Sequence, residues 1–216
     1  MTPNRPDNSR EKEMFNAGYQ IIAGVDEVGR GPLAGSVIAA AVTMDWQQVP
    51  EEFSLLVNDS KKMTAKARIK LVQLLQEMAD SAIGEATVNE IDQLNIRQAS
   101  LLAMQRAVAK LKKQPQMVLV DGRDIPILPM AATAIIGGDR KCMSIAAASV
   151  IAKETRDLMM LELDRDYPLY GFARHKGYPT AFHREALQRH GVSPVHRKTF
   201  APVARLIPLF QPKKEN

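Results

Sequence analysis

Short apolar runs alternate with longer amphipathic stretches along most of the chain. The apolar runs have the length and the β-branched content of strands, and they cover residues 20–27, 35–44, 82–88, 117–120 and 133–136. Hydrophobic positions recur at helical spacing in residues 64–78, 96–113, 144–163 and 181–190. Because strands come early and helices are interleaved and then close the chain, the pattern predicts an α/β fold. We expect a mixed β-sheet flanked by helices, with a helical C-terminal extension.

The remaining stretches lack periodicity. Residues 1–16 are polar and contain two prolines, which predicts a flexible N-terminal leader. Residues 50–60 and 170–180 are predicted to be loops, the second of them aromatic and basic. We therefore divide the chain into the leader (1–16), a main domain (17–163) and a C-terminal helical region and tail packed on that domain (164–216).

Composition indicates a globular protein of the reducing cytoplasm. Hydrophobic residues make up 45% of the 216 residues and charged residues 25%, which excludes extensive disorder. Cys142 is the single cysteine, so an internal disulfide is excluded. No apolar signal segment opens the sequence, and the longest run of small apolar residues, 33–42, is too short to span a bilayer.

The charge balance favours a polyanionic partner. The net charge is +5 and the sequence pI is about 9.3, although the chain contains 24 acidic residues. Lys and Arg attract phosphates, and nucleic-acid binding releases counterions. Many proteins without such a partner are mildly basic, so charge alone does not decide the point.

Acidic residues stand where predicted strands end, at Asp26 with Glu27, at Asp121 and at Asp139. In α/β sheets these ends face the crevice where ligands bind. Carboxylates gathered there would be hard oxygen ligands, which suit Mg²⁺ or Mn²⁺. Two such ions held about 4 Å apart is the arrangement that cleaves phosphodiesters by in-line attack.

Two features of the sequence argue for caution. Asp121-Gly122 and Gly138-Asp139 are also ordinary turn sequences. Successive strand residues point to opposite faces, so Asp26 and Glu27 cannot share a site from a regular strand. Either the strand breaks at the following glycine turn, or Glu27 contributes through its backbone carbonyl.

The run Asp26-Glu27-Val28-Gly29-Arg30-Gly31-Pro32-Leu33-Ala34-Gly35 resembles the signature of the type 2 ribonucleases H, bacterial ribonuclease HII in particular. Further segments match the family in its order: Asp59-Ser60-Lys61-Lys62, Asp121-Gly122, Asp139, residues 144–153 with Thr155-Arg156-Asp157, residues 175–180 and residues 196–200. The resemblance covers residues 21–202.

The resemblance implies an endonuclease on a ribonuclease-H-like fold, with residues 17–163 as its catalytic domain. It would cut the RNA strand of RNA–DNA hybrids and nick 5′ of ribonucleotides in duplex DNA, leaving 3′-hydroxyl and 5′-phosphate ends. Such nicking would give the protein a role in ribonucleotide excision repair. The implied metal ligands, for two Mn²⁺ or Mg²⁺ ions, are Asp26, Glu27, Asp121 and Asp139. The implied substrate-binding residues are Gly29, Arg30 and Gly31, which would read the ribose 2′-hydroxyl, Lys61 and Lys62 on phosphates, and Tyr178 on the sugar at the RNA-to-DNA junction.

One segment departs from the family pattern. Gly137-Gly138-Asp139 stands where the family often has Lys-Gly-Asp, which removes one positive charge beside the fourth carboxylate. Asp157 is a rival fourth ligand, although an ion pair along its helix is a sufficient explanation for it. We favour Asp139.

The C-terminal tail and the alternatives complete the expectations. Leu206, Leu209 and Phe210 resemble the short peptides that bacterial proteins insert into a sliding clamp, without their usual leading Gln; the alternative, which we favour, is that these side chains fold back onto the domain. Alternative functions are another nuclease or recombinase of the same fold and a non-catalytic binder of RNA–DNA hybrids. We expect a monomer, and the absence of a large N-terminal domain argues against the related HIII type.

Overall fold

The computed structural model describes residues 5–58, 60 and 63–207. The strands are β1 (Ile22–Val28), β2 (Val37–Thr43), β3 (Asp80–Ala86), β4 (Met117–Asp121) and β5 (Ala131–Ile135). The α-helices are α1 (Ser9–Asn16), α2 (Glu51–Leu56), α3 (Ala65–Met78), α4 (Val88–Ala109), α5 (Met143–Asp166), α6 (Phe172–His175), α7 (Ala181–His190) and α8 (Ala201–Ala204), and a 3₁₀ turn, η1, covers Gly138–Arg140.

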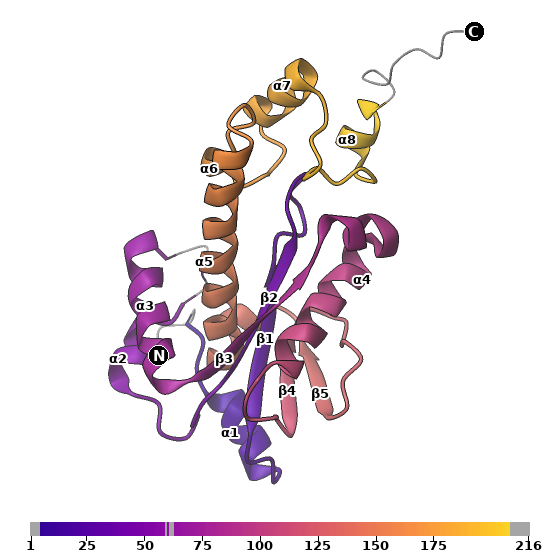
Figure 1. The fold of residues 1–216 in the computed structure, drawn as a ribbon. Coiled ribbons are helices and arrows are strands. Elements are labelled where there is room, and N and C mark those ends of the chain that lie inside the picture. The colour runs from indigo at the N-terminus through magenta and orange to yellow at the C-terminus, as the bar shows by residue number, and fades with distance from the viewer. Residues whose placement is uncertain (1–4, 59, 61–62, 208–216) are drawn as a thin grey trace, which may run out of the picture.

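The strands form one mixed sheet in the order β3-β2-β1-β4-β5. β2 runs antiparallel to both of its neighbours, β1 and β3, whereas β4 and β5 run parallel to β1. Figure 1 shows α5 and α3 on one face of this sheet and α4 on the other. The predicted α/β fold with a mixed sheet flanked by helices is confirmed.

Alternating side chains of the central strands supply two separate cores. Ile38, Ala40 and Val42 face α5, and Ala39 and Ala41 between them face α4. Glycines allow the helices to lie very close: a Cβ at Gly24 would come 2.2 Å from the backbone of Ser144 in α5. α5 is therefore held against the middle of β1 along its first turns.

The C-terminal region forms a third core at the end of the sheet where β1 finishes. Leu33 and Ala34, which follow β1, pack with Phe172 of α6, Leu187 of α7 and Val203 of α8. Figure 1 shows α6, α7 and α8 grouped beyond that end. Residues after β1 and apolar residues of the C-terminal region therefore share one core.

Two stretches expected to lack structure are partly helical, and those expectations are wrong. Ser9–Asn16 forms α1, and the fully buried Glu11 on it accepts a hydrogen bond from the backbone N–H of Ser144 (2.7 Å). Glu51–Leu56 forms α2, whose Phe53 is buried. In both cases tertiary contact orders a short, polar helix that has little helical signal of its own.

The helix expected from residue 96 begins earlier. Thr87 and Glu90 make a capping box at the start of α4, and Asn95 (φ 68°) marks a kink within it. α6 and α8 are short helices within stretches expected to be irregular. In the described part of the chain, no helix combines the length and the apolar character needed to cross a bilayer.

Candidate active site

Three carboxylates meet at one edge of the sheet. β1 and β4 are parallel, with Val25 opposite Val120, so that Asp26 and Asp121 follow at the same end of the two strands. One carboxylate oxygen each from Asp26, Glu27 and Asp121 lies within 4.8 Å of the others. The sequence expectation that strand-end carboxylates converge is confirmed for these three residues.

Glu27 joins the cluster in a way that the sequence argument excluded. β1 continues through Val28 without a break, and Glu27 still reaches Asp26 and Asp121 with a side-chain oxygen. The pairing of β1 with β4 ends at Val25, so β4 is not paired with β1 at Asp26 and Glu27. The glutamate side chain can therefore bend around the strand edge, and the alternation rule fails here.

The cluster is electrostatically unfavourable by itself. Burial, followed by the charges of Glu27 and Asp121, holds the pKa of Asp26 well above its usual range. Burial also raises the pKa of Glu27, although Arg30 Nη1 lies 3.1 Å from Glu27 Oε1 and opposes that shift. Glu27 Oε2 is buried and has no hydrogen-bond partner among the described residues. Crowded, buried carboxylates with an unpartnered oxygen fit a divalent cation.

Asp139 lies near this cluster but outside its 4.8 Å group. It is buried in η1, and its charge contributes to raising the pKa of Asp26. The preceding residue, Gly138, donates its backbone N–H to Asp121 Oδ1 (2.7 Å), which ties η1 to the end of β4. Arg140 Nε lies 3.8 Å from Asp139 Oδ1, so an arginine supplies a positive charge where the family often has lysine at position 137.

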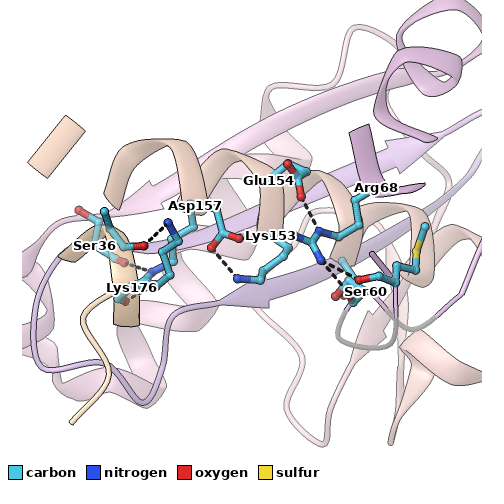
Figure 2. A network of polar contacts seen from close by, with 11 residues as sticks. Ser36, Ser60, Arg68, Lys153, Glu154, Asp157 and Lys176 are labelled. Carbon is cyan, nitrogen blue, oxygen red and sulfur yellow. Dashed lines mark hydrogen bonds and ion pairs between the residues drawn. The ribbon is translucent and has the colours of Figure 1, made fainter. Parts of the chain in front are cut away.

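Asp157 takes part in a different network, along α5 (Figure 2). Lys153 Nζ lies 2.5 Å from Asp157 Oδ1, and Arg68 Nη2 lies 3.7 Å from Asp157 Oδ2. Arg68 also pairs with Glu154. These ion pairs account for Asp157, and the structure places it outside the three-carboxylate cluster.

The same network reaches Asp26 through two serines. Arg68 donates to the carbonyl oxygens of Met63 (3.0 Å) and Ser60 (3.4 Å), as Figure 2 shows for Ser60. The hydroxyls of Ser60 and Ser149 are 2.8 Å apart, and Ser149 donates to Asp26, which lowers the pKa of that carboxyl. Asp59, Lys61 and Lys62 lie outside the described residues, so the predicted phosphate contacts of the two lysines remain predictions.

The glycine turn after Glu27 adjoins Tyr178. Gly29 has φ 96°, a conformation that favours glycine. A Cβ at Gly31 would lie 3.5 Å from Cε1 of Tyr178, whose side chain is 43% exposed. From the resemblance, the turn and Tyr178 were both expected to bind the nucleic-acid substrate. The structure brings them together next to the carboxylates.

The family model for ribonuclease HII matches residues 23–203. A ribonuclease HII from Paracoccus denitrificans (strain Pd 1222) is 50% identical over 205 residues, which cover 94% of this chain and 96% of the relative. The chain belongs to the ribonuclease HII family. A ribonuclease HII from Vibrio cholerae (strain O395) is 53% identical over 192 residues, covering 88% of this chain and 91% of the relative. The crystal structure of ribonuclease H2 from Pyrococcus horikoshii OT3 covers 88% of this chain and 99% of its own, with a TM-score of 0.75 and 27% identity.

Membership of the ribonuclease HII family makes this protein a hydrolytic ribonuclease, as the motifs predicted, with the ribonuclease-H-like fold. The sequence reasoning missed two arginines beside the glycine turn, Arg156 and Arg197, which are fully buried. Both stand inside segments that matched the family pattern, Thr155-Arg156-Asp157 and residues 196–200. From sequence alone, an arginine in either segment is expected to be exposed at the surface, and only the fold shows that both side chains are buried.

Three histidines lie beneath Tyr178 and are also missed by sequence reasoning. Nδ1 of His183 bonds to the carbonyl oxygen of Tyr178 (3.0 Å), and Nε2 of His183 lies 3.0 Å from Nε2 of His196. The ring of His175 stacks on that of His183 at 4.4 Å between centroids. Burial lowers the pKa of His183 to about 4 and that of His196 to about 3, so both rings are neutral at pH 7. Neutral imidazoles therefore support the backbone under the tyrosine.

Proposed function

We propose that this member of the ribonuclease HII family hydrolyses the RNA strand of RNA–DNA hybrids and nicks 5′ of ribonucleotides embedded in duplex DNA. The products would carry 3′-hydroxyl and 5′-phosphate ends, and nicking would begin ribonucleotide excision repair. The observation that supports this proposal is the meeting of the three-carboxylate cluster with the Gly29-Arg30-Gly31 turn and Tyr178. Groups suited to cleavage and groups suited to reading a ribose thus adjoin at the end of β1.

Asp26, Glu27 and Asp121 would hold divalent cations, with Asp139 as the fourth ligand. The crowding of buried carboxylates and the unpartnered Glu27 Oε2 support this assignment. Two bound Mn²⁺ or Mg²⁺ ions would supply an activated water and charge stabilisation at the scissile phosphate. The N–H group of Gly138 orients the Asp121 carboxylate, and the Ser149 hydroxyl orients that of Asp26.

The Gly29-Arg30-Gly31 turn would recognise the 2′-hydroxyl, which is both a donor and an acceptor and which distinguishes RNA from DNA. Glycine at positions 29 and 31 allows a sugar to approach the backbone closely. Tyr178, 43% exposed beside Gly31, would pack on the sugar at the junction. Lys61 and Lys62 would contact backbone phosphates, which position a duplex without reading its sequence.

The deciding experiment uses duplex DNA with one ribonucleotide, an RNA–DNA hybrid and an all-DNA duplex of the same sequence, each with Mg²⁺ or Mn²⁺. We expect a nick on the 5′ side of the ribonucleotide and cutting of the hybrid RNA strand, with both products lost in Asp26→Asn. Cutting of the all-DNA duplex would contradict the proposal, and so would binding of the hybrid without cleavage by the wild type.

We also propose that the protein acts as a monomer in the cytoplasm and that its tail can contact a sliding clamp. Leu206 packs against the third core in the structure, which agrees with the fold-back alternative for that residue. Leu209 and Phe210 lie outside the described residues. Deletion of residues 208–216 should abolish clamp pull-down while leaving cleavage of the single-ribonucleotide duplex intact. Pull-down that survives the deletion, or that never occurs, would contradict the clamp contact.

A further inference from the structure

Two buried guanidinium groups lie behind the glycine turn without a carboxylate partner at ion-pair distance in the described part of the chain. Arg156 and Arg197 have 1% and 0% of their surface exposed. Burial lowers the pKa of Arg156 to about 10 and that of Arg197 to about 9, so both remain cations at pH 7. Burying an unpaired charge is costly, so an arrangement of this kind needs a reason beyond packing.

Arg197 binds the carbonyl oxygens at both ends of the loop that contains the turn. Its Nη2 donates to Gly29 O (2.6 Å) and to Ser36 O (3.3 Å), its Nη1 to Arg30 O (3.1 Å), and its Nε to Gly35 O (2.9 Å). A guanidinium has five N–H donors in a fixed plane, and that of Arg197 makes four hydrogen bonds here. One side chain thus closes the loop over residues 29–36.

Arg156 joins the same loop to the segment that carries Tyr178. Its Nη2 donates to Ala34 O (3.1 Å), its Nε to Ser36 O (3.2 Å) and its Nη1 to Lys176 O (3.0 Å). Figure 2 shows Ser36 and Lys176 on either side of these bonds. A Cβ at Gly29 would lie 2.3 Å from Nε of Arg156, so glycine is required at this position. The two arginines therefore lock the turn and Tyr178 into one unit.

The direction of the carbonyls fixes the direction of the N–H groups. The peptide unit is planar and trans, so a carbonyl and the N–H of the next residue point to opposite sides. With the carbonyls of Gly29 and Arg30 held on Arg197, the N–H groups of Arg30 and Gly31 face the side of the turn away from Arg197. That orientation would be lost if the carbonyls were released.

We propose that Arg197 is a positioning residue that sets the preference of this enzyme for ribose over deoxyribose. It does so by holding the Gly29-Arg30-Gly31 backbone in the orientation that reads the 2′-hydroxyl. This inference rests on the proposed function of the turn, and it assigns the specificity of the turn to a fully buried residue that binds Arg30 and Gly29 from 167 and 168 positions away in sequence.

The test compares Arg197→Lys with the wild type on the single-ribonucleotide and all-DNA duplexes. Lysine keeps the charge but has one nitrogen, which cannot reach four carbonyls. We expect kcat/KM on the ribonucleotide duplex to fall about 10- to 100-fold, since small misplacements of recognition groups have effects of this size. The affinity ratio between the two duplexes, measured by fluorescence anisotropy with Ca²⁺ replacing the catalytic ion, should fall with it.

Val108→Ala is the control for a general loss of stability, because Val108 is buried in the α4 core. It should lower Tm without changing the affinity ratio. Asp92→Ala is a second test variant, in which the buried guanidinium of Arg197 is unchanged. It keeps the proposal testable if Arg197→Lys does not fold. Asp92 accepts from the backbone N–H groups of Lys198 and Thr199 (2.9 Å each), so its loss should loosen the Arg197 segment and reduce the ratio less strongly.

Hydrogen exchange at residues 29–36 gives a readout that does not depend on activity. Exchange there should accelerate in Arg197→Lys and in Asp92→Ala and stay unchanged in Val108→Ala. The proposal is overturned if the wild type prefers the ribonucleotide duplex and both test variants have the same affinity ratio as the wild type. It is also overturned if hydrogen exchange at the turn does not change in these variants. A wild type without any ribose preference would instead contradict the proposed function, and the exchange data would still decide whether Arg197 orders the turn.

Discussion

At the scale of single residues, the proposed metal ligand Asp26 carries a cost to stability. It is buried next to two further carboxylates, and its pKa is raised by that burial and by their charges. Ionising it at pH 7 therefore opposes folding when no cation is bound. Sites of this kind illustrate a trade between stability and activity.

We predict that Asp26→Asn abolishes cleavage and stabilises the metal-free protein. The neutral amide removes one of three crowded charges, which should raise Tm in EDTA by about 2–4 °C, the shift that about 1 kcal/mol produces in a protein of this size. Differential scanning calorimetry measures it. Glu77→Gln, at an exposed position of α3, is the control and should leave Tm and cleavage unchanged. A lower Tm for Asp26→Asn would contradict the electrostatic account.

Mn²⁺ should stabilise the wild type more than Asp26→Asn. A ligand that binds only the folded state raises Tm by mass action. We therefore expect Mn²⁺ to raise Tm in the wild type and much less in Asp26→Asn, with the same scans as the measurement. Equal shifts in both proteins would place the ion elsewhere.

At the scale of elements, α3 and α5 are joined by Arg68, which pairs with Glu154 and lies 3.7 Å from Asp157. The side chains of Arg68 and Glu154 are only 13% and 16% exposed, so water screens the pair weakly. Lys70 on the same helix pairs with Glu52 of α2 at 2.8 Å, but there both side chains are more than half exposed. The two pairs provide a matched comparison of shielded and exposed ion pairs.

Arg68→Ala should lower the free energy of unfolding by about 2–4 kcal/mol, because it leaves the shielded Glu154 carboxylate without its partner and removes one of the two cations beside Asp157. Lys70→Ala should lower it by about 0–1 kcal/mol, as is usual for an exposed pair. Urea denaturation measures both values. Similar losses for the two variants would show that shielding at Arg68 contributes little.

The buried histidines of α7 and of the turn before α8 should make the stability of the protein depend on pH. His183 and His196 have folded pKa values of about 4 and about 3, below the unfolded value of 6.5. Their neutral forms stabilise the fold above pH 6.5, and this stability is lost as the pH falls from 6.5 towards the folded values, because the unfolded state takes up protons first. At pH 5 the loss should be about 2 kcal/mol for each histidine.

Urea denaturation at pH 7 and pH 5 tests this expectation. His183→Gln should show a smaller loss between the two pH values than the wild type. His190→Gln, at an exposed position of α7, should show the wild-type loss. Equal losses in the wild type and in His183→Gln would contradict the assignment of neutral, buried rings.

The sequence predicted these elements unevenly, for physical reasons. Strands with continuous apolar runs, such as β2, were predicted well because their pattern reports burial on both faces. α1 and α2 were missed because short helices depend on tertiary contacts, here those made by their own buried residues Glu11 and Phe53. Among site residues, Asp26 and Asp121 follow from strand ends, whereas Arg156 and Arg197 are positioned by contacts between segments far apart in sequence.

At the scale of the whole molecule, the division at residue 163 separates segments that depend on each other. Leu33 and Ala34 of the main domain complete their core with Phe172 and Leu187. Ala34 also pairs with His196 in an isolated β-bridge, and Arg197 holds four carbonyls of residues 29–36. Without residues 164–207 these carbonyls and apolar side chains would lose their partners. The C-terminal region is therefore a structural part of the site.

We predict that the protein unfolds in a single transition and that a fragment ending at residue 163 does not fold. Unfolding by urea should give one midpoint whether followed by far-UV circular dichroism or by the fluorescence of Trp46, which is buried in the α5 core distant in sequence from the C-terminal region. Hydrogen exchange should show β1 and α7 opening with similar free energies. Two separate midpoints, or a folded fragment that retains the exchange protection of β1, would instead mean that the C-terminal region is an independent domain. In that case the turn would have to be ordered by the main domain alone, and Arg197 would not be needed to hold it.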